Sequence, residues 1–486
     1  MASEIRVNKI INRSGLSTVT FSDDGAIVSG IVSATVYTGS GANLTDLPAG
    51  NLSGTVSDAR ISTLTASKLS GDLPAISAAN LTNLPAANIT GTLPAIDGSA
   101  LTGVGIGTDG AVNTSGIITA TAFVPTTGQL SHRNLIINGA MNVAQRGTSS
   151  TSVGYVTIDR FNTDYGGENE AMTYTQADVS SGTTPYTEGF RKTFKVQNGN
   201  QTGGAGSGDY VFVRTKIEAQ DLANSGWNYV SSSSFITLSF WVKSSVAQTF
   251  YGRLESVDGT AYNYPYSYSV SANTWTKVVK TIPGNSNLQI DNNNGSGMEF
   301  HWDIFRGSNF SDTGVALDTW ATYASGTRTP SQTSTWWTTN DATWELTGVQ
   351  LEVGSVATPF EHKSFIEDKL RCYRYYYKPE RGSNVLDLHG QGHRVADTMG
   401  AVVQAYPWPV EMRATPSLSY DDNNGNSNRF AINGSNNSTT FNVSMSLEPN
   451  IQGTMGGFQY PHGISNISEN ESFRLWAYNF NASAEL

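Results

Sequence analysis

A repetitive stretch without aromatic residues constrains this chain more than any other feature. No Phe, Trp or Tyr lies between Thr38 and Ala122, and no glutamate lies between Ile5 and Gly167. Short motifs recur here and at its edges, and the copies are Ala42–Ala49 with Ala79–Ala86, Lys68–Ile76 with Asn88–Ile96, and Ser29–Tyr37 with Ser115–Phe123. Such self-similarity is typical of stacked units that cannot bury their apolar face alone.

The energetics of one repeat favour assembly of several chains. Each unit offers a few small aliphatic side chains, worth about 1.5–3 kcal/mol apiece when fully buried. Ordering its backbone costs about 1–2 kcal/mol per residue. Three chains wound about a common axis offset that cost, because each Leu or Ile then meets its symmetry copies. We therefore expect residues 38–130 to form an intertwined β shaft in a homotrimer; the alternative is a disordered Gly/Ser/Thr linker.

The composition is that of a polar, turn-rich β protein. Charged residues make up 14% of the chain, against about 25% in typical domains. With a net charge of -11, the chain has no excess of basic residues that would favour nucleic acid or anionic lipid. We therefore expect it to bind its ligand through neutral chemistry, that is, through uncharged groups, which suits sugars. Cys372 is the only cysteine, which excludes an internal disulfide. The sequence contains no run of 18 apolar residues, so it predicts no membrane-spanning helix.

The first residues, MASEIRVNKI, lack the charged and apolar regions of a signal peptide. Surface-type composition without disulfides or an export signal is natural for a virion component. We therefore expect a protein of the virion tail that is assembled in the host cytoplasm and released by lysis.

The chain becomes rich in aromatic residues from about His132. Phe235–Lys243 and Trp344–Val353 predict buried strands, and the alternation in Met298–Phe305 predicts a half-buried strand. Turn-rich segments separate these strands. The pattern favours a β-sandwich or jelly roll over residues 131–363.

A capping box at Ser364–Glu367 predicts a short helix, and its expected face holds Ile366, Leu370, Tyr373 and Tyr377. A smaller β region follows and ends in the alternating segment Phe473–Phe480. The predicted fold is therefore all-β: an elongated homotrimeric fibre with residues 1–37 as an attachment segment, the intertwined β shaft, the jelly roll, and a distal β tip with its helix at 364–486.

Several motifs resemble tail-fibre or receptor-binding proteins of bacterial viruses. Ser3–Thr35 is similar to the N-terminal segment of structural proteins of cyanobacterial phages. Asn134–Ser149, with Ile158–Phe161 after it, resembles the start of tail-fibre domains with a jelly roll like that of carbohydrate-binding modules, and Trp344–His362 resembles its closing strand. Further matches to the distal domain of such fibres are RCYRYYYK, EMRATPSLSY and NASAEL. The resemblance implies a homotrimer whose N-terminus is anchored on the virion, and it transfers no catalytic residue.

Aromatic side chains are the candidate sugar contacts, because a tyrosine joins a flat apolar ring to a hydroxyl. The candidates are Tyr262, Tyr264, Tyr266, Tyr268, Trp336, Trp337, Tyr406, Trp408, Tyr460 and His462. The four alternating tyrosines would project from one strand face; the alternative is that they pack inside the sandwich. Trp336 and Trp337 look like an exposed loop pair, with rim packing as the alternative. The four distal residues lie in proline-stiffened loops, with loop packing or trimer contacts as the alternative.

Catalytic and metal signatures are absent from the sequence, which contains no GxSxG, HExxH or Walker motif. Glu299, His301 and Asp303 share one strand face, but a spacing of about 13 Å over four residues suits a solvated face better than a carboxylate pair. Cys372 is interpreted as a buried small side chain. A structural calcium has no ligand spacing to support it, and we expect no cofactor and no metal; His389, His393 and His462 at a trimer axis would be the alternative.

Three classes of function are compatible with the sequence. The leading one is adhesion without catalysis: a trimeric tail fibre that recognises host surface glycan, such as lipopolysaccharide or capsule, and attaches through its N-terminus to tail, baseplate or adaptor proteins. The second is a glycan depolymerase of the tailspike type. The third is a purely structural or capsid-decorating fibre.

Overall fold

The computed structural model describes three parts of the chain. Near the N-terminus it describes residues 9–11, 18–22, 25–29, 31–33, 35, 36 and 38, and then it describes residues 131–379 without a gap. The distal part comprises residues 386–395, 398–403, 406–422, 424–433, 439–443, 446–448, 455–459 and 472–486. The predicted shaft, residues 38–130, lies outside these residues except for Thr38, so the shaft and the domain boundaries stay predictions.

The chain divides into two units, Met1–Ser115 and Gly116–Leu486. In the first unit, three short antiparallel strands form a meander, namely β1 (Lys9–Ile11), β2 (Thr18–Ser22) and β3 (Gly25–Ser29). Val19 pairs with Ile10 on one side and with Val28 on the other. The strands are rich in β-branched residues, which fit the pleated surface.

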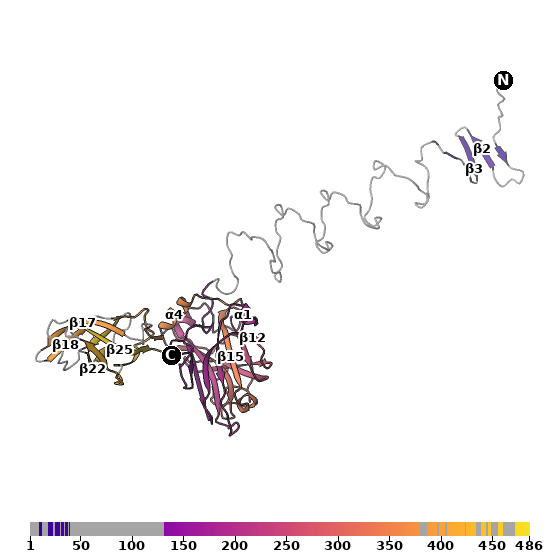
Figure 1. Ribbon diagram of the computed structural model, residues 1–486. Coiled ribbons are helices and arrows are strands. Elements are labelled where there is room, and N and C mark those ends of the chain that lie inside the picture. The colour runs from indigo at the N-terminus through magenta and orange to yellow at the C-terminus, as the bar shows by residue number, and fades with distance from the viewer. Residues whose placement is uncertain are drawn as a thin grey trace. The chain divides into compact units, whose positions relative to one another are not determined.

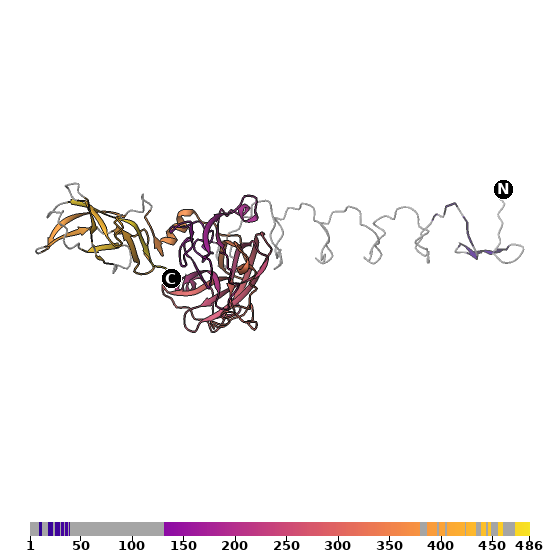
Figure 2. The same ribbon diagram turned by 60° about the horizontal axis from the view of Figure 1, so that its bottom comes forward.

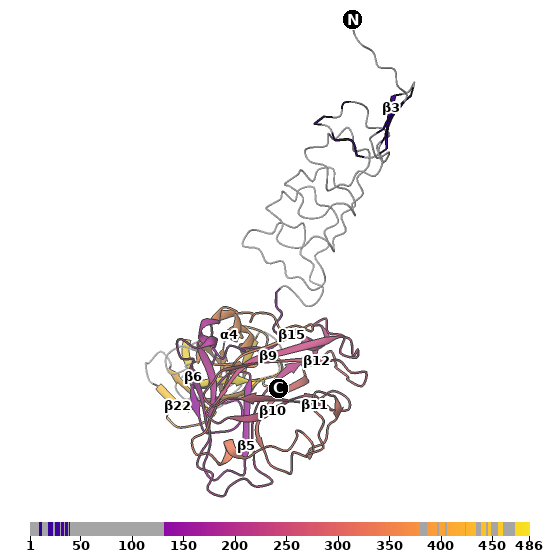
Figure 3. The ribbon, with the colours of Figure 1, turned by 90° about the vertical axis from the view of Figure 1, so that its right-hand side faces the viewer.

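The second unit contains two six-stranded sheets whose strand pairs are all antiparallel (Figure 1). The order in the first sheet is β14 (Ala321–Thr322), β11 (Tyr262–Val270), β10 (Gln248–Ser256), β13 (Ser296–Arg306), β8 (Tyr210–Glu218), β5 (Phe161–Gly166). The order in the second is β12 (Thr276–Pro283), β9 (Phe235–Ser244), β15 (Thr343–Val353), β7 (Lys192–Gln197), β6 (Thr173–Asp178), β4 (Ser149–Ser150). Figure 3 shows β9 and β15 of the second sheet beside β10 and β11 of the first.

The two sheets enclose one large apolar core. Phe240 and Trp302 are both fully buried, and their rings meet edge to face across the sheets at 5.7 Å. The predicted all-β fold with a β-sandwich of jelly-roll type is confirmed. Within the described residues, no helix combines the length and hydropathy that a bilayer crossing requires.

The predicted strands at Phe235 and Trp344 are confirmed as β9 and β15, and both are buried along most of their length. The register of β15 shifts between Thr347 and Gln350. Gly348 lies at this irregularity with φ +63°, and a Cβ there would come within 2.7 Å of the Phe190 ring, so glycine is needed on both counts.

Short helices accompany the sheets, and those among the described residues are α1 (Thr184–Thr187), α2 (Ala219–Ala223), α3 (Thr335–Thr338) and α4 (Phe365–Tyr373). The predicted capping box of α4 is confirmed, because the Ser364 hydroxyl accepts a hydrogen bond from the Glu367 amide. Its predicted face is only partly right. Tyr373 is buried, but Ile366 is 58% exposed and Leu370 is 39% exposed.

The distal strands, orange to yellow in Figure 2, include a seven-stranded sheet around the long β25 (Ser472–Ser483). This strand confirms the one predicted at the C-terminal end. Its other members are β16 (Tyr376–Tyr377), β17 (Leu386–Val395), β18 (Thr398–Val403), β20 (Ser417–Asp421), β21 (Phe430–Asn433) and β22 (Thr439–Val443). A separate three-stranded sheet consists of β19 (Tyr406–Pro407), β24 (Met455–Gln459) and β23 (Ser446–Glu448). A second core of aromatic side chains, including Tyr420, Phe430 and Phe480, packs beneath β25.

Candidate functional site

A groove of about 400 Å³ lies on the outer face of the first sheet of the sandwich. Its floor comes from β5, β8, β10 and β13, and its wall comes from the segment between β13 and α3. The lining residues are Asp164, Tyr210, Phe212, Arg214, Arg253, Glu255, Glu299, His301, Arg306, Phe310, Tyr323 and Arg328. Rings and charged groups are thus gathered into one hollow of the surface.

Strand register builds the floor in rows. The apolar side chains of β13, such as Trp302, point into the core, so the intervening residues point outward. In one row His301 lies between Arg253 of β10 and Arg214 of β8. In the next row Glu299 lies between Glu255 and Lys216. Register therefore makes Glu299 and Lys216 direct cross-strand neighbours and places Arg253 and Arg214 on either side of His301.

Ion pairs tie the floor together. Asp303 is fully buried, and its Oδ1 accepts a bond of 2.6 Å from Arg306 Nε. Arg253 Nε lies 3.3 Å from Asp303 Oδ2, close enough for charge attraction although it is not aligned as a hydrogen bond. Glu299 pairs with Lys216 at 2.8 Å and with Arg214 at 3.1 Å. Both Arg253 and Arg306 are 3% exposed, so these pairs are largely shielded from solvent.

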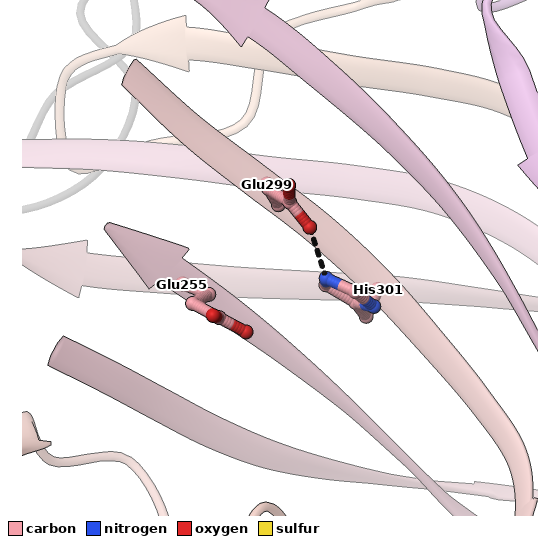
Figure 4. Close-up of side chains that lie close together, drawn as sticks. All are labelled: Glu255, Glu299 and His301. Carbon is pink, nitrogen blue, oxygen red and sulfur yellow. Dashed lines mark hydrogen bonds and ion pairs between the residues drawn. The ribbon is translucent and has the colours of Figure 1, made fainter. Parts of the chain in front are cut away.

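His301 connects the two rows as a neutral ring (Figure 4). Its Nε2 donates to Glu299 at 3.0 Å, and its Nδ1 accepts from Arg253 Nη2 at 3.1 Å. Burial and the Arg253 guanidinium lower the pKa of His301 to about 3. Burial alone would raise the pKa of Glu299, but the bond from His301 and the charges of Arg214 and Lys216 outweigh it and hold the pKa well below its usual value.

Glu255, Glu299 and His301 come close enough together to be tested as a metal site, since one ligand atom from each lies within 4.8 Å of the others. The surrounding charges do not fit a cation. Arg253 forms a short ion pair with Glu255 and contacts His301, and Glu299 already has two cationic partners. A divalent ion would have to displace or face these cations, so we assign no metal here.

Aromatic rings and arginines form the wall above the floor. Tyr210 and Phe310 meet edge to face at 5.5 Å. Arg328 Nε donates to the Tyr323 hydroxyl at 2.8 Å, and its guanidinium lies 5.0 Å from the centre of the Phe310 ring. Such contacts hold flat rings and hydrogen-bonding groups in fixed positions next to one another.

The neutral His301 predicts a pH-dependent stability. A histidine in an unfolded chain has a pKa of about 6.5, whereas that of His301 in the folded protein is about 3. Between these two pH values the histidine is protonated in the unfolded state and neutral in the folded state. Stability is therefore lost as the pH falls through that window. Between pH 7 and pH 5 this group should cost about 2 kcal/mol of the free energy of unfolding.

Urea unfolding at the two pH values measures the effect. His301→Gln should reduce the loss between pH 7 and pH 5 by about that amount. The control is Asn287→Gln, an exposed change that removes no titrating group, and its loss should equal that of the unchanged protein. An equal loss in the His301 variant and the unchanged protein would contradict the neutral, buried ring.

The four tyrosines of β11 divide between the core and its edge. Tyr264, Tyr266 and Tyr268 are 0–5% exposed and belong to the sandwich core, whereas Tyr262 is half-buried. The prediction of sugar contacts is wrong for the three buried rings, and the interior alternative is right. The reason is strand orientation: Tyr268 faces Phe240 of the other sheet at 5.5 Å, and the Tyr266 ring lies over Gly252, where a Cβ would clash.

Trp336 and Trp337 are also fully buried, so the prediction of an exposed loop pair is wrong. They lie in α3, where Trp337 packs against Phe305 at 5.1 Å and donates from Nε1 to the Gly204 carbonyl. The predicted solvated face of β13 is wrong as well: Glu299 is 8% exposed, and the other two members of that trio are more deeply buried.

Other predictions about single residues have mixed outcomes. Trp241 and Trp344 lie in buried strands as predicted, Trp275 is half-buried, and the Cys372 thiol is buried, which raises its pKa well above its usual value. Trp408 is 7% exposed and stacks on Phe480, so its predicted sugar contact is wrong. The side chains of Tyr406, Tyr460, His462, His389 and His393 lie outside the described residues, and their roles stay predictions.

A second cavity of about 420 Å³ lies near α2 and α4, and Arg133, Asp221 and Arg371 are among its lining residues. The only Tyr, Phe or Trp in its wall is Tyr375, which is buried and donates its hydroxyl to Glu218 at 2.5 Å. This cavity therefore lacks the aromatic wall of the groove.

Comparison with known proteins finds no matching family model and no matching curated protein. Among solved structures, the chain is similar to the enzymatically active domain of tailspike protein 4 of bacteriophage CBA120, at 10% identity over 46% of this chain and 21% of that one, with a TM-score of 0.25. It is similar to a putative sugar-binding protein of Bacteroides thetaiotaomicron at 11% identity over 46% and 100% of the chains, with a TM-score of 0.24. It is also similar to the N-terminal cellulose-binding domain of Cellulomonas fimi β-1,4-glucanase C at 10% identity over 44% and 99%, with a TM-score of 0.22. At these identities and TM-scores, the similarities do not establish a function for this chain.

Proposed function

We propose that this protein is a tail fibre of a bacterial virus that adheres to host surface glycan, and that the groove on the first sheet binds the sugar. The groove carries the proposal, because it combines half-exposed rings with fixed hydrogen-bonding groups in a hollow of about 400 Å³. That volume lies within the range of small-ligand sites. The motif resemblance of Asn134–Ser149 and Trp344–His362 to fibre jelly rolls supports the viral role.

The chemistry of the groove suits a saccharide. A sugar ring offers C–H faces to rings such as those of Tyr323 and Tyr210, and it offers hydroxyls to the surrounding donors and acceptors. The floor is rigid, because Asp303, Glu299 and their cationic partners hold one another in place. A ligand therefore meets groups that need little reordering.

Trimerisation would raise the strength of attachment. The aromatic-free repeat of residues 38–130 supports a homotrimer, since one chain cannot bury its sparse apolar residues. Three weak sites on one fibre gain avidity, because the second and third contacts are intramolecular. Light scattering of the full-length protein should therefore give three times the mass of one chain. Residues 1–37 attach this trimer to tail, baseplate or adaptor proteins in the virion.

Removal of one ring from the groove tests the binding role. Tyr323→Ala in the full-length protein should weaken binding to purified host envelope polysaccharide by about fivefold or more, since an aromatic contact stabilises by about 0.5–1.5 kcal/mol beyond its buried area. The matched control is Tyr186→Ala, which removes another half-buried tyrosine that lies under an arginine, Arg191, at 3.9 Å. Equal affinities of the two variants would place the binding site elsewhere.

The spacing of two carboxylates in the groove favours the alternative function, a glycan depolymerase. Carboxylate oxygens of Glu255 and Glu299 approach within 4.8 Å, near the spacing of about 5–5.5 Å in retaining glycosidases. Both carboxylates are held in ion pairs, however, Glu255 with Arg253 and Glu299 with Arg214 and Lys216, whereas a retaining glycosidase needs one of its two carboxyl groups as a protonated general acid. We therefore propose adhesion without cleavage. New reducing ends after incubation with host polysaccharide, lost in Glu255→Gln, would favour the enzyme instead, whereas no binding to host cells would favour a purely structural fibre.

A further inference from the structure

The groove is rich in arginine although the chain as a whole is acidic. Carboxylates outnumber Lys and Arg by 40 to 29 in the sequence, yet four arginines and three carboxylates line the groove. Most of these charges satisfy one another. Arg253 pairs with Glu255 and Asp303, Arg306 also pairs with Asp303, and Arg214 pairs with Glu299.

Arg328 is the exception. Within the part of the chain that the structure describes, no carboxylate lies within ion-pair distance of its guanidinium, and the Nε bond to the Tyr323 hydroxyl is its only side-chain hydrogen bond. Its terminal nitrogens therefore keep their donors available, and the side chain is half-buried in the wall. An arginine on an open surface would be unremarkable, but this one is held in a groove.

Neighbouring groups fix the position of this cation. The guanidinium lies 5.0 Å from the centre of the Phe310 ring and 5.7 Å from that of Tyr323. Arg306 lies 5.8 Å from the centre of the same Phe310 ring, so two guanidiniums lie next to one aromatic side chain. Their mutual repulsion is relieved by an anion, and a planar guanidinium presents a fork that matches carboxylate or phosphate oxygens.

We propose that the groove selects glycans that carry an anionic substituent, a carboxylate, phosphate or sulfate, and that Arg328 binds this group through its terminal nitrogens. The inference rests on the proposed function, since the groove can select among glycans only if it binds glycan. It narrows that function to glycans with an acidic group. It also differs from the expectation that a chain with net charge -11 recognises sugar through neutral chemistry alone.

A panel of paired oligosaccharides tests the selection with the full-length protein. The acidic members carry glucuronate, galacturonate, mannuronate, a 6-phosphate or a 6-sulfate, and each is paired with its uncharged parent. At least one acidic member should bind about tenfold or more tightly than its parent, since bonds between ions are among the strongest polar contacts. The ratio should fall as ionic strength rises, because salt screens partly exposed charges.

Two variants locate the effect. Arg328→Gln should abolish the preference for the acidic member, whereas Arg191→Gln should keep it, because Arg191 lies over Tyr186 outside the groove. A preference that survives Arg328→Gln, or equal binding of every acidic member and its parent, would overturn the inference while leaving glycan binding intact. If no member and no host polysaccharide binds, the proposed function itself fails.

Discussion

Glu485→Gln is expected to lower the free energy of unfolding of the second unit by about 3–5 kcal/mol, because it leaves a buried guanidinium without its carboxylate. Arg160 is 1% exposed and forms a short ion pair with Glu485 Oε2. Arg146 pairs with the other carboxylate oxygen at 3.0 Å. Within the described residues, Arg160 has no other carboxylate partner, so the variant cannot replace the lost charge.

The surroundings of this ion pair explain why its loss should be costly. Arg160 has φ +72°. A residue other than glycine keeps this left-handed conformation only where surrounding contacts hold it in place. Its guanidinium stacks on Tyr375 at 3.5 Å and donates to the Lys216 carbonyl at 2.8 Å. Arg413 adds bonds to the carbonyls of Ala484 and Glu485. The last residues of the chain are thus fastened to the sandwich by the ion pairs of Glu485 and to the distal part by Arg413.

Urea unfolding followed by tryptophan fluorescence measures the change, with circular dichroism as a second probe. Asp178→Asn is the control, because Asp178 and Lys192 form an ion pair of 2.6 Å that is exposed on both sides. That pair should contribute at most about 1 kcal/mol. Equal unfolding midpoints for the two variants would show that the C-terminal ion pair is not a buried structural link.

Asp303→Asn should be similarly destabilising, by about 3–5 kcal/mol, because two buried arginines depend on one carboxylate. Asp303 is 0% exposed and holds Arg306 at 2.6 Å and Arg253 at 3.3 Å. Arg253 retains Glu255 as a partner, but in the described structure no second carboxylate lies within ion-pair distance of Arg306. The asparagine keeps the shape but removes the charge and one acceptor oxygen, so the effect reports polar interactions with the arginines and not packing.

The same unfolding measurement applies, and Asp318→Asn is the control. Asp318 pairs with Lys280 at 3.7 Å and is 54% exposed, so its loss should be small. If Asp303→Asn also changed stability by less than about 1 kcal/mol, the floor of the groove would not be the rigid ionic array described above, and Arg306 would have to find another partner.

Local sequence patterns predicted the architecture well, because apolar runs, alternation and capping boxes follow directly from the geometry of strands and helices. The strands at Phe235 and Trp344, the all-β class and the cap of α4 all followed from such local signals. Local signals do not state which face of a strand is covered. In β13 both faces are buried, since the segment with Phe310, Tyr323 and Arg328 folds over the polar side.

The candidate site was mispredicted for a related reason. Tyr266 was expected either to contact sugar or to pack inside the sandwich. Its ring is fully buried, and its hydroxyl has no hydrogen-bond partner among the described residues. The apolar ring and the space above Gly252 outweigh that cost. The groove itself comes from Arg214, Arg253 and Glu299, which meet only through cross-strand register. Alternating charges in β8, β10 and β13 were the available signal, but no sequence pattern specifies which strands are neighbours.

The central claim is that sugar binds over β8, β10 and β13, and a crystal structure of the full-length protein soaked with the tightest-binding oligosaccharide tests it most directly. The account predicts saccharide density between Tyr323 and Arg214, with an acidic substituent next to Arg328. Clear saccharide density at another place on the chain, with the groove lacking sugar, would contradict it.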